Sequence, residues 1–307
     1  AGGTPYDELS VAIHQKGDVT PKHHANMYYN GTIGKLGIDF NMDYMWQKDN
    51  SNLLNDEASG NFDDARVASS TLNHSRLFAE KLVFSYPVWK GSIEFGNEYT
   101  SSRFATDYTT NASQLTSADS RVDESNIAGF VQLAQRFGIW NVGAGLRYEH
   151  VAFKYLENGQ KRDDMSRSYN NLCPSLSVST VIRKVQLALS YTHKTQRPNY
   201  NSLDGTIDYI NRFTFEGGNP YLKPEKIHDI QLSAVWSHFF TQISYSYKKD
   251  PILNTTIPYG DDGEVVLIVE DNFPKMQKLE AFAGGQFRFG IWQPKVNVGI
   301  IKQWLTI

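Results

Sequence analysis

Two things are scarce in this sequence: cysteine, and long runs of apolar residues. The single cysteine, Cys173, permits no internal disulfide and belongs to no metal-binding spacing. The longest β-rich apolar run is Val265–Val269, far short of the roughly eighteen residues that a membrane-spanning helix needs. A disulfide framework and a helical membrane anchor are therefore both excluded as the basis of the fold.

The sequence also lacks an excess of charge of either sign. It has 30 basic and 33 acidic side chains, well mixed, for a net charge of -3, so there is no basic field of the kind that binds nucleic acid. Residues 1–10 show neither the basic start nor the apolar centre of a signal peptide. We expect that such a peptide was removed, or that the sequence is an internal piece of a longer precursor.

Aromatic residues, in contrast, are abundant. They make up 13% of the chain, with 17 Tyr, 17 Phe and 6 Trp, yet the mean hydropathy is only -0.46. A transmembrane β-barrel has this combination, because its lumen, turns and loops are polar while rings form girdles at both membrane interfaces.

Long segments alternate between apolar and polar residues. Between Lys35 and Trp46, every second residue from Leu36 onward is apolar, and the residues between them include Asp39, Asn41 and Asp43. Since successive side chains of a strand point to opposite faces, one face is apolar and the other polar. The same alternation occurs in the segments 92–100, 185–192, 229–236, 242–247 and 295–300. Segments 70–86 and 126–137 mix both kinds on both faces, which predicts a bulge or a filled lumen.

Short and long connections alternate along the chain. The short turns are predicted at 31–34, 88–91, 137–140, 181–184, 237–240 and 290–294, and the long polar stretches at 49–66, 109–123, 157–169, 196–225 and 249–273. This predicts an all-β, antiparallel up-and-down transmembrane barrel, with about twelve strands joined as six hairpins, short periplasmic turns and long extracellular loops. The first twenty residues, including a possible strand at 9–14, are expected to end an incoming loop.

Aromatic pairs lie beside four of the short turns: Tyr86 and Trp89, Phe137 and Trp140, Phe239 and Phe240, Phe289 and Trp292. Rings at turns favour a membrane interface; a local hydrophobic cluster is the alternative.

One long connection has a distinctive sequence, RPNYNSLDG at 197–205 and GGNPYLKPE at 217–225. The pairs Asn219-Pro220 and Lys223-Pro224 keep the preceding residues extended, and adjacent glycines at 217 and 218 permit a reversal. We therefore expect a structural role for this motif, with direct contact to a ligand as the alternative. Its residues are Gly218, Asn219, Pro220, Leu222, Pro224 and Glu225.

The motif resembles one in the barrels of TonB-dependent receptors, of the outer membrane protein β-barrel family of Bacteroidetes. The matching residues are Arg197, Pro198, Tyr200 and Leu203, then Gly218, Asn219, Pro220, Leu222, Lys223, Pro224 and Glu225. The regular alternation of hairpins and long loops extends the resemblance, less specifically, over residues 24–304.

The resemblance implies a Gram-negative outer-membrane receptor that imports a scarce nutrient of the siderophore, glycan or peptide class. Its barrel would have about 22 strands, filled by an N-terminal plug and coupled to the TonB system. Residues 1–307 would be a barrel segment in contact with outer-membrane lipid, without a plug, a TonB box or a signal peptide. A passive porin or small closed barrel is the alternative. A soluble β-sandwich with sugar-binding loops is a third, disfavoured by the long two-faced strands.

The loop at 196–225 has the arginine and ring content of a binding surface. Its candidate ligand-binding residues are Arg197, Tyr200, Tyr209, Arg212, Phe213 and Phe215. Polar residues on the inner face are expected to meet the plug and water; they are Asp39, Asn41, Asp43, Glu94, Glu98, Arg147 and Glu149.

Other chemistry finds little support. His23 and His24 are adjacent and would point to opposite faces. The acidic pairs at 63–64, 163–164 and 261–262 lack calcium-loop spacing, and the last reads as the turn of a hairpin between 253–258 and 264–270. Neither G-x-S-x-G nor H-E-x-x-H occurs. We predict no enzyme, no cofactor and no metal site.

Overall fold

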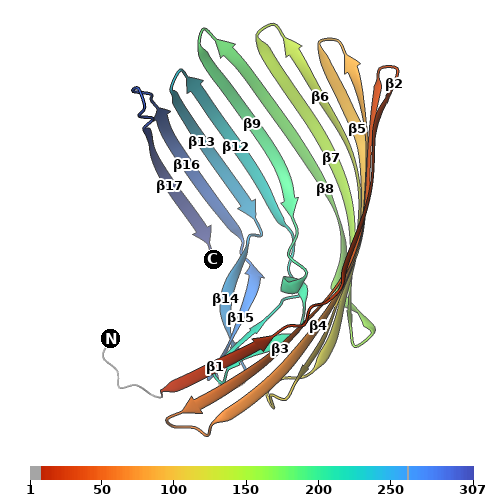
Figure 1. Ribbon diagram of the computed structural model, residues 1–307, viewed down its shortest axis with the longest axis vertical. Helices are drawn as coiled ribbons and strands as arrows, with labels where there is room; N and C mark the ends of the chain where they lie inside the picture. The colour runs from red at the N-terminus through yellow and green to blue at the C-terminus, as the bar shows by residue number, and fades with distance from the viewer. Residues whose placement is uncertain (1–7, 261–262) are drawn as a thin grey trace.

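The computed structural model describes residues 8–260 and 263–307, which form an antiparallel sheet curled into an open trough (Figure 1). This main sheet has 13 strands. They are β1 (Leu9–Lys16), β2 (Lys22–Ile33), β3 (Leu36–Ser59), β4 (Ala65–Val88), β5 (Gly91–Thr110), β6 (Ala118–Phe137), β7 (Trp140–Glu157), β8 (Gln160–Ile182), β9 (Val185–Gln196), β12 (Glu225–Trp236), β13 (Phe239–Lys249), β16 (Lys275–Gln286) and β17 (Lys295–Thr306). Within the described residues, no helix is long and apolar enough to cross a bilayer.

The strands follow one another around the sheet in chain order. β2 pairs with the first half of β3 and β1 with its second half, so these two share one edge position. Every later pair is antiparallel, up to β16 and β17. The predicted all-β architecture of about twelve strands in six hairpins is confirmed, and the possible strand at 9–14 is β1. In the part of the chain that the structure describes, no pairing joins β17 to β1 or β2.

The short turns lie where the sequence predicted them, at the upper end of Figure 1. Five have two residues between the strands, and the first of the two has a positive φ: Gly34 (62°), Trp89 (52°), Gly138 (61°), Arg183 (57°) and Ser237 (53°). A positive φ there gives the mirror-image turn, whose twist matches that of the flanking strands. Glycine adopts it freely, whereas the other three residues accept strain.

The predicted extents of the first three long loops were wrong. β3 and β4 stay paired over most of 49–66, and the stretch 157–169 contains only a two-residue turn, Asn158–Gly159, followed by the start of β8. Polar residues on both faces resemble a loop in sequence. Beyond the membrane, however, both faces of a strand can meet water while the backbone still pairs with its neighbours.

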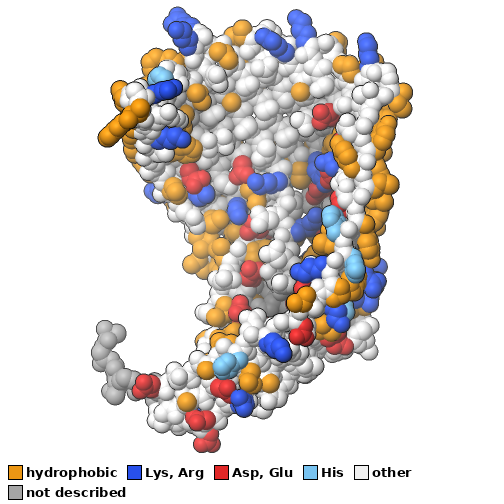
Figure 2. Space-filling model, in the orientation of Figure 1, with side chains coloured by type: hydrophobic (Ala, Val, Ile, Leu, Met, Phe, Trp, Pro, Cys, Tyr) orange, Lys and Arg blue, Asp and Glu red, His pale blue; other side chains and the backbone are white. Residues whose placement is uncertain are grey.

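The register places the charged residues of several strands on one face. Lys81 lies opposite Glu98 across β4 and β5, and Arg147 lies opposite Phe130 across β6 and β7. Charged side chains dot the middle of the concave face, whereas hydrophobic ones line the outer margin beside β2 (Figure 2). Pairing along 70–86 and 126–137 is continuous, so no bulge explains their mixed pattern. Phe130 instead faces the lumen, with the Lys81 ammonium 5.6 Å from its ring centre.

A second sheet of four strands lies inside the lower end of the trough (Figure 1). It consists of β10 (Ile207–Asn211), β11 (Thr214–Gly217), β15 (Val265–Asn272) and β14 (Ile252–Tyr259). The hairpin predicted at 253–270 is confirmed as β14 and β15, although Asp261 and Asp262 of its turn lie outside the described residues. The parallel pairing of β11 with β15 joins two long connections, both predicted as loops.

Two hydrophobic clusters hold this end together. The first contains Ala112, Leu115, Tyr209, Phe215, Leu267 and Val269. The second contains Val122, Phe153, Tyr155, Met165, Leu203 and Leu222. The rest of the trough has few buried apolar residues, so the apolar core lies at the long-connection end.

Candidate functional site

The connection 197–224 between β9 and β12 folds against the concave face of the main sheet. Val151, Phe153 and Tyr155 of β7 are buried, and they lie an even number of residues from Arg147, so they share the lumen face with it. Leu203, in the short helix η1 (Asn201–Leu203), and Leu222 pack against Phe153 and Tyr155 in one cluster. The connection therefore lies inside the mouth of the trough.

The Gly-Asn-Pro motif is attached to its surroundings through the backbone. The Asn219 N–H donates to the Ser202 carbonyl at 2.7 Å, and its side-chain amide donates to the Glu270 carbonyl at 3.1 Å. Arg167 of β8 donates to the carbonyl oxygens of Pro220, at 2.8 Å, and Leu222. These contacts hold the connection to β8 and β15.

Two further motif residues have specific surroundings. A Cβ atom at Gly218 would lie 1.9 Å from the Asp204 carbonyl oxygen, so only glycine allows this approach. Glu225 is 4% exposed; its carboxylate pairs with Lys248 at 2.9 Å and accepts the Ile252 N–H at 2.7 Å. It thereby links the start of β12 to β13 and β14.

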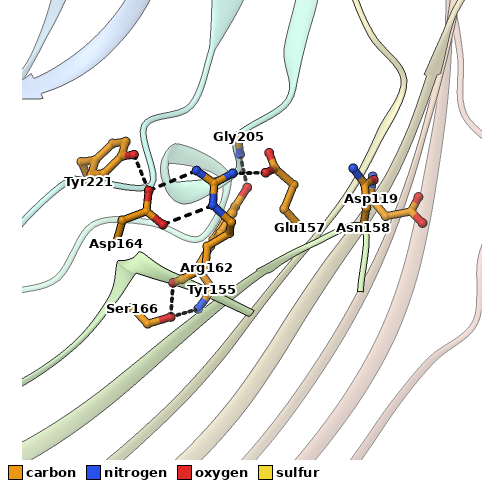
Figure 3. A network of polar contacts seen from close by, with 9 residues as sticks. All are labelled: Asp119, Tyr155, Glu157, Asn158, Arg162, Asp164, Ser166, Gly205 and Tyr221. Atoms are coloured by element: carbon orange, nitrogen blue, oxygen red, sulfur yellow. Dashed lines mark hydrogen bonds and ion pairs between the residues drawn. The ribbon is translucent and has the colours of Figure 1, made fainter. Parts of the chain in front are cut away.

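A polar network joins the β7–β8 hairpin to the same connection (Figure 3). Arg162 pairs with Asp164, at 3.1 Å, and with Glu157, and Tyr221 donates to Asp164 at 2.8 Å. Hydrogen bonds from Arg162 and then Tyr221 lower the pKa of Asp164 to about 2. The Tyr155 hydroxyl accepts the Gly205 N–H at 3.1 Å.

Two of the predicted ligand-binding residues meet at one lumen-facing carboxylate. Arg197 donates to Glu124 at 2.8 Å, and the Tyr200 hydroxyl donates to the same oxygen at 3.3 Å. The Tyr200 ring stacks on Phe104, with 6.0 Å between centroids. Burial, then the charge of Glu124, raises the pKa of Tyr200 to about 12, so this hydroxyl stays protonated at neutral pH.

The other four candidates lie around the second sheet. Arg212 pairs with buried Glu57 at 3.0 Å, and Phe213 packs edge-on against Phe62. Phe215 is 0% and Tyr209 4% exposed, so these two rings pack in the first cluster. The structure thus divides the six residues between two places.

A polar cavity of about 400 Å³ opens between the second sheet and the trough wall. Its carboxylates are Asp204, Asp208, Glu216 and Glu270, and amides and hydroxyls such as Asn73 and Thr206 complete the lining. Burial, followed by the charges of Asp204 and Glu216, raises the pKa of Asp208 to about 6. Its Oδ1 atom is buried without a hydrogen-bond partner among the described residues.

Further into the trough, ion pairs link several strands across the lumen face. Glu98 accepts from Lys81 at 2.8 Å and from Arg147 at 2.6 Å, and Arg147 also pairs with Glu149 at 2.6 Å. Near the edge strand, Asp39 accepts from Tyr28 and Asn30, and Asp43 lies 3.0 Å from His24. The residues expected on the lumen face thus lie together on it.

A sheet with one apolar and one polar face, short turns at one end and inward-folded connections at the other is the wall of a transmembrane β-barrel. The model of the outer membrane protein beta-barrel family matches residues 31–303, and the chain belongs to this family. The protein accordingly resides in the outer membrane of a Gram-negative bacterium. Comparison with curated proteins yields no significant match.

Solved structures share the fold at low sequence identity. The copper transporter OprC has a TM-score of 0.61 and 12% identity, covering 92% of this chain and 53% of its own. The ferric yersiniabactin uptake receptor FyuA from Yersinia pestis has 0.60 and 13%, covering 94% and 44%. The FrpB iron transporter from Neisseria meningitidis has 0.51 and 13%, covering 92% and 53%. The chain spans about half the length of these structures. The likeness to TonB-dependent receptor barrels is confirmed, while a Bacteroidetes origin stays a prediction.

Sequence reasoning missed several residues of this region, among them Glu57, Glu124, Asp204, Asp208 and Arg167. Glu57 lies in a stretch assigned to a loop, although its position in an extended β3 would have placed it on the lumen face. The partners of Glu124, Asp204 and Arg167 come from distant segments, and Asp208 is distinguished by its burial, so no local pattern marks them.

Proposed function

We propose that this chain forms the barrel wall of an outer-membrane receptor that imports a scarce nutrient, with the ligand bound at the extracellular mouth. The observation that carries the proposal is the inward fold of the connections 197–224 and 250–274, which narrows the mouth and encloses a polar cavity of about 400 Å³. Such a mouth restricts free diffusion and presents side chains to a ligand arriving from outside.

The lining of this cavity favours a particular ligand chemistry. It combines carboxylates with amide and hydroxyl groups and contains no lysine or arginine among its described lining residues. Hydroxyl or amine donors would therefore be bound, whereas an anionic ligand would be repelled. Of the nutrient classes implied by the family, a glycan or a basic peptide suits this site better than an anionic siderophore.

Ligand contact is proposed for the side chains near the cavity and near Glu124, in particular Arg197 and Tyr200. The buried rings of Tyr209 and Phe215 support the second sheet instead. Plug and TonB coupling belong to the same proposal, because the lumen ion pairs of Glu98 and Arg147 offer a polar wall against which a plug can pack.

Binding and transport can be tested together. The purified protein is titrated with pools of neutral oligosaccharides, basic tripeptides and ferric siderophores. The double variant Asp204→Asn with Asp208→Asn should bind the oligosaccharide pool or the basic tripeptide pool more weakly than the wild type does. Asp163→Asn with Asp271→Asn serves as the charge-matched control. Accumulation of the bound solute in cells should require the TonB system. Steady ion conductance in planar bilayers without a bound ligand would instead favour the passive porin.

A further inference from the structure

The convex face carries a row of charges that the lumen site does not use. Arg76 of β4 lies directly opposite Arg103 of β5, which lies opposite Asp123 of β6, which lies opposite Lys154 of β7. All four point outward, because their neighbours Ser102, Glu124 and Phe153 face the lumen; the Glu124 carboxylate pairs there with Arg197. Three cations and one anion thus form one row across four strands.

The protein itself does not neutralise the positive charge of this row. Asp123 accepts from Arg103 at 2.6 Å and from Arg121 at 3.1 Å, so one carboxylate serves two guanidinium groups. Arg76 and Lys154 are exposed and form no ion pair within the described part of the chain. Like charges directly opposite in a ladder destabilise the pair, and an anion between Arg76 and Arg103 would remove that repulsion.

A groove lies next to the row. Its volume is about 500 Å³, and it is lined by Arg76, Arg103 and Lys154 together with Phe78 and with Asp123, whose carboxylate is already paired with Arg103 and Arg121. Small side chains form its floor, namely Ser101, Ser125 and Ala152, which lie opposite one another in the register beneath the cations. The groove therefore has a cationic rim, a shallow floor and one apolar wall.

The position of the groove along the strands matches the level of the lipid headgroups in the outer leaflet. Below it, toward the short turns, the convex face is apolar, with Phe95, Ile127 and Val131 exposed. Tyr99 lies four residues before Arg103 on β5, roughly 13 Å along the strand, and tyrosine is typical of the membrane interface. A lipid whose acyl chains cover the apolar band would place its headgroup at the row.

We infer that this groove binds a phosphate-bearing glycolipid of the outer leaflet, with its phosphate between Arg76, Arg103 and Lys154. Guanidinium groups bind phosphate oxygens in pairs, and the flat floor leaves room for sugar rings. The site lies on the opposite face of the sheet from the proposed nutrient site, and neither inference depends on the other.

The test is a titration of the purified full-length protein with diphosphoryl lipid A, followed by native mass spectrometry in detergent. Arg76→Ser with Lys154→Ser should weaken binding roughly 10- to 30-fold. Lys35→Ser with Lys184→Ser, at the short turns, removes the same charge and should bind like the wild type. Arg76→Lys with Lys154→Arg keeps the charge and should retain binding, whereas Ser125→Phe fills the floor and should reduce it.

Two further titrations test whether the phosphate groups and the rest of the lipid are both needed for binding. Lipid A with both phosphates removed should bind weakly, and millimolar inorganic phosphate should fail to displace the intact lipid. Equal binding by the two double serine variants would overturn the inference. Equal binding of dephosphorylated lipid, or full displacement by inorganic phosphate, would overturn it as well.

Discussion

Neighbouring residues of one strand in this protein face two different environments, the membrane lipid and the water of the lumen. Leu187 lies on the apolar face of β9, opposite Thr180 and Ala234, whereas Ser190 lies on the lumen face, opposite Gln231. The alternation was legible in the sequence because it repeats over many strands.

Leu187→Arg should lower the yield of assembled protein in the outer membrane, because an arginine on the lipid face is destabilising, by about 2 to 4 kcal/mol at the midplane and less toward the interface. Ser190→Lys, three residues away, should assemble normally, since its ammonium meets water. The yield of folded protein in outer-membrane fractions measures both. Equal yields would show that the faces are assigned wrongly.

Asp208 offers a second test at the scale of one residue. Its pKa is raised to about 6 by burial and by nearby carboxylates, so the folded state retains a proton that the unfolded state releases near pH 4. Stability of the second sheet should therefore fall as the pH rises from about 4 to about 6, and level off above that.

Asp208→Asn should remove this loss and stabilise the second sheet at pH 7.5 by about 1 to 3 kcal/mol. Hydrogen exchange of the β10 and β11 amides, corrected for intrinsic rates, reports the change at pH 4.5 and 7.5. Asp163→Asn, on the exposed β7–β8 hairpin, is the control. An unchanged protection pattern in Asp208→Asn would contradict the raised pKa.

The candidate ligand residues show what a sequence cannot reveal at this scale. Arg212 was selected for its charge and its aromatic neighbours, yet its guanidinium pairs with Glu57, 155 residues away along the chain. Composition identifies a residue able to bind, while the identity of its partner depends on the folded chain.

At the scale of elements, the turns were predicted well because glycine, polar pairs and flanking apolar runs are local signals. Strand ends at the other side were predicted poorly. There the alternation fades, since both faces meet water, and pairing is decided by the neighbouring strand. The parallel contact between β11 and β15 joins two separate connections, and no local signal marks it.

Glycine substitutions at the two adjacent residues of the turn between β8 and β9 should change the stability of the protein in opposite directions. Arg183 has a φ of 57°, and a left-handed conformation costs a residue with a side chain roughly 1 to 2 kcal/mol. Arg183→Gly should therefore raise the urea midpoint of the refolded full-length protein slightly, whereas Lys184→Gly, at an ordinary φ, should lower it. A loss in both variants would show that Arg183 is held by contacts that outweigh its strain.

At the scale of the molecule, the trough has a packed end and an open end. The two hydrophobic clusters and the second sheet fill the end that carries the long connections, while the lumen beyond it is lined by ion pairs. The hairpin count was predictable from the rhythm of turns, but the filling of the mouth was not, because it brings together connections that are adjacent only in space.

The two edges of the main sheet lead to the last prediction. β2 and β17 each pair with one neighbour among the described residues, and a bilayer does not tolerate unpaired backbone groups. If the importer proposal holds, closure needs further strands to reach about 22. Residues 1–307 refolded alone in detergent should then aggregate or remain protease-sensitive, without the heat-dependent gel shift of a closed barrel. Co-refolding with the remaining strands of such a barrel should restore that shift. A monodisperse, heat-modifiable product that conducts ions in planar bilayers would instead identify a small porin, and the import proposal, with its plug and TonB coupling, would have to be abandoned.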